Sequence, residues 1–157
     1  MRRRQTWKIG DVFLVALKDD SHAVGQIVAQ ERAILNSVSC AFFATRAEEN
    51  DFASMDPMPL EKLIAVLLVT RDLLDNGVWQ VVAQRPVTLP RELLPYERLR
   101  EAGFIGAKVR GSGIVNEFLN AFFGLSPWDD WHDPAYLDEF LISPDKKPDN
   151  LILRDRR

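Results

Sequence analysis

Short apolar runs and polar turns alternate along the first half of the chain. Runs of this length, rich in Val, Ile and Phe, predict β-strands. Five of them follow one another, at residues 12–17, 23–30, 38–45, 63–70 and 78–83. The polar stretch 18–21 separates the first two runs, so we expect these two to form a hairpin. Gly25 lies inside the second run, which predicts a bulge or a close approach to the backbone.

The pattern changes after residue 85. Pro86 and Pro90 end the sheet region, because proline has no N–H to donate to a strand ladder. Apolar residues then recur at helical spacing after Gly111-Ser112-Gly113, which supplies capping residues, and Gly124 ends the helix. The elements predicted here are a short or broken helix over 91–102, helices over 114–123 and 134–141, and a final edge strand over 151–153.

Strands grouped ahead of helices indicate an α+β protein. We predict a mostly antiparallel, barrel-like sheet of about five strands, of the SH3-like kind, with C-terminal helices. The chain has 157 residues, of which 46% are hydrophobic. This length is typical of one domain and is sufficient for a sizeable core. We therefore expect a single domain over 1–157, with residues 1–6 and 154–157 as loose tails.

Charge is unevenly distributed, although the formal net charge is only −3. Segment 85–110 is basic and contains Arg85, Arg91, Arg98, Arg100, Lys108 and Arg110 against three glutamates. Segment 128–149 is acidic and contains Asp129, Asp130, Asp133, Asp138, Glu139, Asp145 and Asp149 against two lysines. The mild overall acidity argues against nucleic acid as the main partner. The acidic segment offers a surface for a basic protein.

Catalytic residue types are scarce. Cys40 is the only cysteine, so no intrachain disulfide forms, and it lies in an apolar run without a nearby histidine to activate it. With only His22 and His132, no Ser–His–Asp or Cys–His arrangement can be assembled. Residues 128–133 gather carboxylates around His132 but lack the ligand set of a zinc or calcium site. We predict a protein that is not an enzyme and has no metal or cofactor; a hydrolase using these carboxylates is the alternative.

The same segment is our candidate for a partner-binding surface. Tryptophan is enriched at binding hot spots, and clustered carboxylates attract a basic partner. The predicted binding residues are Trp128, Asp129, Asp130, Trp131, Asp133, Asp138 and Glu139. A loop whose tryptophans are tucked inward is the other interpretation. A second acidic surface is available at Glu48, Glu49, Asp51 and Asp56.

No segment predicts contact with a membrane. The longest clean apolar run covers residues 63–69, whereas a membrane-spanning helix needs about 20 such residues. The charged start, Met1-Arg2-Arg3-Arg4, does not lead into the apolar stretch of a signal peptide. We therefore expect a cytoplasmic protein.

Two regions resemble a bacterial family called immunity protein 26. Lys8-Ile9-Gly10-Asp11-Val12-Phe13 followed by Ala23-Val24-Gly25-Gln26-Ile27-Val28 is similar to its opening hairpin. Gly111-Ser112-Gly113-Ile114-Val115, Pro127-Trp128-Asp129 and Asp133-Pro134-Ala135-Tyr136-Leu137-Asp138 are similar to its closing region. The resemblance spans residues 7 to about 145.

This resemblance implies a mostly-β immunity protein of a polymorphic-toxin system. Such a protein is encoded beside a toxin and neutralises it in the cytoplasm by binding. Many toxins of this kind are nucleases with basic active sites, where an acidic surface would mimic phosphate. The alternative function, from the residues alone, is a small β-barrel that binds nucleic acid through the basic residues of 91–110.

Overall fold

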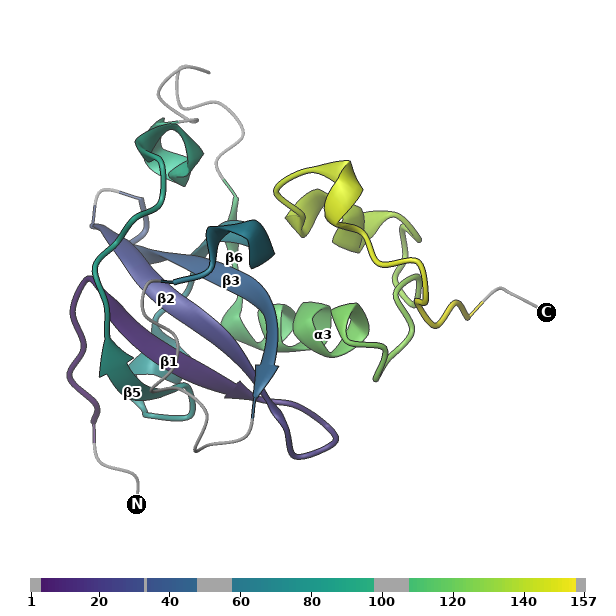
Figure 1. The fold of residues 1–157 in the computed structure, drawn as a ribbon, viewed down its shortest axis with the longest axis horizontal. Coiled ribbons are helices and arrows are strands. Elements are labelled where there is room, and N and C mark those ends of the chain that lie inside the picture. The colour runs from purple at the N-terminus through teal and green to yellow at the C-terminus, as the bar shows by residue number, and fades with distance from the viewer. Residues whose placement is uncertain (1–3, 33, 48–57, 98–107, 155–157) are drawn as a thin grey trace.

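The protein is built around one six-stranded sheet, with strand order β5-β1-β2-β3-β4-β6 (Figure 1). The computed structural model describes residues 4–32, 34–47, 58–97 and 108–154. The strands are β1 (Asp11–Ala16), β2 (His22–Glu31), β3 (Ser37–Ala47), β4 (Leu63–Val69), β5 (Gln80–Gln84) and β6 (Val109–Arg110). Four of the five strand pairs are antiparallel, and the pair β4–β6 is parallel.

The α+β class agrees with the structure, but the barrel-like closure is not confirmed. β5 and β6 stand at opposite ends of the strand order and do not pair, so the sheet is not closed. β6 contributes two residues only, which is too little to continue the sheet around to β5. The result is a mixed sheet of six strands that is not closed, and the SH3-like barrel is not confirmed.

Helical segments are short except for one. Among the described residues, the α-helices with both ends defined are α1 (Asp72–Asp75) and α3 (Ser112–Phe122), and residues 95–97 are also helical. The 3₁₀ helices with defined ends are η2 (Leu60–Lys62), η3 (Arg91–Leu93), η4 (Tyr136–Phe140) and η5 (Pro144–Lys146). Gly124 follows α3 with a φ of 76° and its N–H donates to the Ala121 carbonyl, as a glycine that ends a helix does. None of the helices that the structure describes is long and apolar enough to cross a membrane.

Most predicted strands lie within two residues of the observed ones, but three elements differ. β6 and α1 were not predicted, because two to four residues are too few to show a period. The predicted edge strand over 151–153 is wrong, since the structure assigns no strand there. That segment is instead held by one hydrogen bond, from the Trp128 N–H to the Ile152 carbonyl at 2.9 Å.

Both faces of the sheet are covered, which explains why the strands contain so few polar residues. α3 packs Val115, Phe118 and Leu119 against one face, and the C-terminal segment lies on the same side (Figure 1). Leu89, Leu93 and Leu94 cover residues of the other face. Cys40 points into the first of these cores and is fully buried, which raises the pKa of its thiol well above the usual range. Cys40 is therefore a buried member of the core.

Residues of both predicted tails contact the rest of the chain within the described part of the structure. The Gln5 Nε2 donates to the carbonyls of Leu74 and Trp79, at 2.8 and 2.9 Å, and its Oε1 accepts a hydrogen bond from the N–H of Val81 at 3.0 Å. At the other end, the N–H of Arg154 donates to an Asp129 carboxylate oxygen. Gln5 therefore connects the N-terminal segment to β5, the edge strand.

A glycine inside a strand predicted a close approach to the backbone, and the Phe13 ring makes this approach at Gly25. It pairs with Phe13 across the β1–β2 ladder, and a Cβ at Gly25 would lie only 2.5 Å from Cζ of the Phe13 ring. We expect Gly25→Ala to lower the free energy of unfolding by about 1–3 kcal/mol, because the ring has to leave its packed position. Urea unfolding measures this. In a Phe13→Leu background the same change should cost less, and an equal cost in both backgrounds would contradict the role given to the ring.

Candidate functional site

The outer edge of β4 makes backbone contacts with described residues near both of its ends. At one end β6 pairs with Leu68 and Val69, and at the other the N–H of Ile142 donates to the Ile64 carbonyl at 2.7 Å. The described residues supply no strand opposite Val66. Backbone groups of alternate residues point to the same side of a strand, so the Val66 N–H and C=O point away from β3, as the Ile64 carbonyl does.

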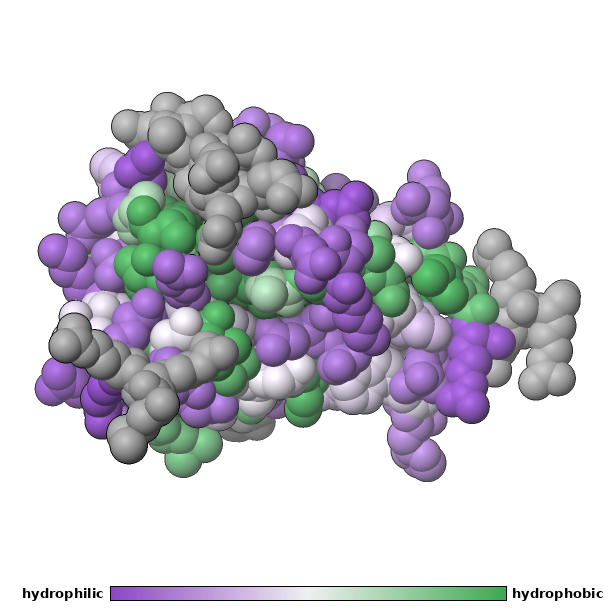
Figure 2. Space-filling view, turned by 90° about the horizontal axis from the view of Figure 1, so that it is seen from below, coloured by the Kyte–Doolittle hydropathy of each residue, from purple (hydrophilic) through white to green (hydrophobic). Residues whose placement is uncertain are grey.

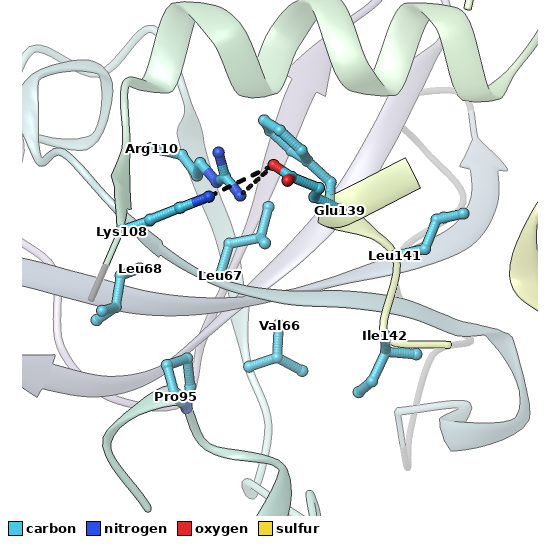
Figure 3. A pocket seen from close by; sticks show the side chains of 10 residues that line it. Val66, Leu67, Leu68, Pro95, Lys108, Arg110, Glu139, Leu141 and Ile142 are labelled. Atoms are coloured by element: carbon cyan, nitrogen blue, oxygen red, sulfur yellow. Dashed lines mark ion pairs between the residues drawn. The ribbon is translucent and has the colours of Figure 1, made fainter. Parts of the chain in front are cut away.

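A hollow of about 340 Å³ lies along this edge. Its floor is Val66, Leu67 and Leu68 of β4, and residues 139–142 of the C-terminal segment form one wall. Figure 3 shows Lys108 and Arg110 reaching toward Glu139, with Leu67 beneath them. The hollow is therefore apolar at its floor and charged at one end.

Arg110 is held in place before any ligand arrives. Its Cζ lies 4.3 Å from the ring centroid of Phe140 and 5.6 Å from that of Tyr136, and its Nη1 donates to the Tyr136 hydroxyl at 3.4 Å. Only 11% of the side chain is exposed. A guanidinium stacked on aromatic rings has a fixed orientation and little hydration to lose, so it binds an anion with a small entropic cost.

Positive charge exceeds negative charge in this hollow. A single Glu139 carboxylate oxygen lies 3.7 Å from the Lys108 Nζ and 3.6 Å from the Arg110 Nη2. Both distances are longer than the roughly 2.7–3.2 Å of a charge-assisted N–H···O hydrogen bond. Among the described lining residues, two cations therefore share one carboxylate and neither is saturated by it.

A row of aromatic rings fixes the C-terminal segment that carries Glu139. Centroids are 5.0 Å apart from Trp131 to Tyr136, 5.2 Å from Tyr136 to Phe140, 5.2 Å from Phe140 to Phe118 and 5.8 Å from Phe118 to Trp128. Phe118 belongs to α3, so the row joins η4 to the helix that packs on the sheet. Aromatic pairs at these separations attract one another beyond their burial.

The tryptophans of the predicted binding surface belong to this row. Trp128 is 1% exposed, and its Nε1 donates to a carboxylate oxygen of Asp138 at 2.7 Å. Trp131 is half-buried against Tyr136. Trp128 thus lies in the core, as the interpretation with tryptophans tucked inward describes.

Carboxylates of the predicted acidic surface have partners within the chain. Asp138 forms an ion pair with Lys147 at 3.0 Å. Asp130 pairs with Arg154, whose N–H also donates to Asp129. The remaining member, Asp133, accepts a hydrogen bond from the Ala135 N–H at 2.9 Å. With Glu139 on Lys108 and Arg110, the local cations offset much of the negative charge that the sequence shows.

The other predicted surfaces are only partly described. Glu48, Glu49, Asp51 and Asp56 lie outside the described residues, as do Arg98 and Arg100 of the basic segment. Arg91 forms an ion pair with Glu97 at 3.2 Å, while Lys108 and Arg110 take part in the hollow. The nucleic-acid alternative, which depends on all the basic residues of this segment, stays a prediction.

The structure describes one carboxyl whose pKa is clearly raised, that of Glu31 at the end of β2. Burial raises the pKa, a hydrogen bond from Ser39 opposes the rise, and the charge of Glu97 adds to it. Glu31 belongs to a different element from Asp129 and Asp133, the carboxylates of the hydrolase alternative. Among the described residues, no three His, Cys, Asp or Glu side chains lie close enough to hold a metal ion.

A second hollow, of about 490 Å³, is lined by Ile9, Gly10 and residues 84–87. Ile9 and Val87 are among the few large hydrophobic side chains exposed to solvent. Figure 2 shows hydrophobic residues in a broken band across a face that is otherwise hydrophilic. Arg85, whose Nη1 donates to the Gln84 carbonyl at 2.7 Å, also lines this hollow, next to the edge strand β5.

Fold and site together define an α+β protein with a preformed binding hollow at a sheet edge. Comparison with known proteins gives the family: the model of Immunity protein 26 matches residues 8–103, which is more than half of the chain. The chain belongs to the immunity protein 26 family. No curated protein and no solved structure matches it. The matched segment contains β1 to β5, whereas Lys108, Arg110 and Glu139 follow it.

Glu139 was predicted as a binding residue from the sequence. Its two cationic neighbours, Lys108 and Arg110, were not predicted to belong to the same site. Lys108 and Arg110 were counted in a basic segment because they are close in sequence to other arginines. One local feature of the sequence separates Arg110 from the other basic residues: Val109 and Arg110 directly precede Gly111-Ser112-Gly113, where α3 begins. That position places them at the sheet edge, which a residue pattern does not show.

Proposed function

We propose that this chain is a cytoplasmic immunity protein that binds a cognate bacterial toxin and neutralises it without catalysing a reaction. The observation that carries the proposal is the match to the immunity protein 26 family over residues 8–103. The geometry supports it, because the best-organised feature among the described residues is a preformed hollow beside β4 that contains the fixed Arg110 guanidinium. These are features of a surface that binds another chain.

Binding by itself makes a quantitative prediction. If neutralisation works by covering the toxin, each toxin molecule needs one immunity molecule. We expect toxin activity, measured with increasing amounts of this chain, to fall linearly and vanish at a molar ratio of one. The toxin to test is the product of the neighbouring gene, and co-expression with this chain should restore growth.

The same titration distinguishes neutralisation by binding from neutralisation by catalysis. Complete silencing of the toxin by a small fraction of an equivalent would mean that each molecule acts repeatedly, and would overturn the non-catalytic proposal. Absence of binding and of growth rescue would overturn the immunity proposal itself.

A toxin with a basic active site, such as a nuclease, is the target that the acidic surface over residues 129–139 was expected to fit. Its ion pairs to Arg154, Lys147, Lys108 and Arg110 weaken the charge argument for that surface. A toxin that binds the acidic surface over residues 129–139 would have to break these internal ion pairs. The hollow beside β4 has an excess of the opposite charge and supports a different mode of contact.

A further inference from the structure

We propose that the toxin places the carboxylate of one acidic side chain in a small basic hollow lined by Arg4, Arg32 and Arg71. This inference rests on the proposed function. It adds the chemistry of the partner at one point of contact, which is a single carboxylate, and the residues that recognise it.

Three separate parts of the chain line this hollow, whose volume is about 240 Å³. One is the N-terminal segment over residues 4–7, and another is the end of β2 with Arg32 directly after it. The third is the start of α1, with Arg71 before the helix and Asp75 in it. Three guanidinium groups and one carboxylate therefore line the same space, which is sufficient for one side chain of a partner.

Arg71 is oriented before any ligand binds. Its Cζ lies 4.9 Å from the ring centroid of Trp7, and its Nη1 donates to the Asn36 Oδ1 at 3.1 Å. The side chain is only 28% exposed. A guanidinium that is stacked on an aromatic ring and held by a neighbour loses little conformational freedom when it binds an anion.

One edge of the Arg71 guanidinium fits a carboxylate, because it presents two parallel donors, Nε and Nη2. Nε is buried and has no hydrogen-bond partner within the described part of the chain. Nη2 lies 3.6 Å from the Asp75 Oδ1, which is longer than a hydrogen bond. A buried donor without an acceptor is unfavourable. The two oxygens of one carboxylate satisfy Nε and Nη2 together.

Asp75 offsets only part of the positive charge in the hollow. Its Oδ1 accepts a hydrogen bond from the Trp7 Nε1 at 2.9 Å, and its Oδ2 lies 3.9 Å from the Arg4 Nη2. The short contact is thus with a neutral indole. Residues 1–3 and 33, which adjoin these segments in the sequence outside the described ranges, include two arginines and no acidic residue. The described lining residues therefore present a net positive charge to a partner.

Asp75 also favours a carboxylate over a phosphate group as the ligand. A phosphate group carries about 1.5 to 2 negative charges at neutral pH, so Asp75 repels it more strongly than it repels a carboxylate. The carboxylate is planar, as the guanidinium is, and the two pair edge to edge. Arginine and tryptophan, which form this hollow, are residue types that dominate the energy of binding between proteins.

Calorimetric titration of the full chain with the product of the neighbouring gene tests the charge argument. Arg32→Glu reverses the charge of an exposed side chain directly after β2, so the fold should tolerate it. We expect its Kd to be at least about tenfold weaker. The control is Lys62→Glu, in which an exposed cation also becomes an anion, before β4 and thus at the other end of that strand from Arg71. Its Kd should stay within about twofold of the wild type.

Asp75→Asn tests the same argument in the other direction. The amide oxygen still accepts from the Trp7 N–H, while the charge that repels a carboxylate is removed, so binding should become tighter by about two- to fivefold. Equal or weaker binding would show that no carboxylate docks next to Asp75. Circular dichroism of each variant checks that it is folded.

The outcome for Arg32→Glu separates this inference from the proposed function. Unchanged affinity in a chain whose wild type binds overturns the docking inference and leaves the proposed function standing. A wild-type chain that does not bind overturns both.

Inorganic phosphate distinguishes a carboxylate site from a phosphate site. At equal ionic strength, phosphate should weaken toxin binding no more than chloride does, because Asp75 opposes it. A specific effect of phosphate that Arg32→Glu abolishes would make the hollow a phosphate site and overturn the choice of a carboxylate.

The Nε–H proton of Arg71 reports the contact in the wild-type chain. In ¹H–¹⁵N NMR spectra with unlabelled toxin, this proton should move downfield in the complex, because it then donates to a charged acceptor. Arg71→Lys identifies the resonance, which is missing from its spectrum. An unchanged resonance in the wild-type complex would overturn pairing at this edge of the guanidinium.

Discussion

Replacing Trp128 with alanine is expected to lower the free energy of unfolding by about 3–5 kcal/mol. The ring is 1% exposed and packs 5.8 Å from Phe118 at the end of the aromatic row. Its Nε1 also donates to Asp138, which keeps that carboxylate next to Lys147. Urea unfolding followed by circular dichroism measures the loss as a shift of the midpoint to lower urea.

Trp128→Phe is the matched control for this prediction. It keeps most of the buried ring but removes the hydrogen bond to Asp138, so we expect a loss of only about 1–2 kcal/mol. If Trp128→Ala unfolded at the wild-type urea concentration and yet failed to bind the toxin, Trp128 would be a contact residue. That outcome would contradict its place in the core.

Replacing Trp79 with alanine should cost a similar amount, about 3–5 kcal/mol, for a different reason. Trp79 is fully buried just before β5, where its ring stacks on Phe13 with centroids 5.1 Å apart and planes at 10°. It meets Phe42 edge to face at 5.9 Å, and its Nε1 donates to Asn116 of α3 at 2.8 Å. This side chain therefore connects β1, β3 and α3, and thermal unfolding should show the loss as a clearly lower Tm.

Asn116→Ala isolates the hydrogen bond from the packing. It removes the acceptor of the Trp79 N–H and keeps the ring stack, so we expect about 1–3 kcal/mol, well below the effect of Trp79→Ala. Equal losses for the two variants would mean that the link to α3, and not the ring packing, accounts for the contribution of Trp79.

The strands β1 to β4 were predictable because their side chains are buried on two covered faces of the sheet. Val12 and Phe13, for example, belong to different clusters although they are neighbours in the chain. The resulting apolar runs are visible in the sequence. The contacts at the outer edge of β4 were not visible, because they come from Val109 and Ile142, more than 40 positions further along.

The sequence predicted which residue types the candidate site contains, but it did not predict how these residues contact one another. Tryptophan and aspartate suggested a binding surface over 128–139, but the structure buries Trp128 and pairs Asp138 with Lys147. The net charge of a segment does not show which cations from elsewhere in the chain form ion pairs with its carboxylates. Arg110 and Glu139 meet only because the aromatic row places η4 beside β6, a tertiary effect that no local pattern contains.

The contact of Gln5 with β5 has a consequence for how the protein behaves at high concentration. An open edge strand without charged side chains tends to recruit a second molecule and start aggregation. β5, with the neutral sequence Gln-Val-Val-Ala-Gln, is such a strand, and Gln5 occupies its Val81 N–H. A side chain from the same molecule thus shields this edge against self-association.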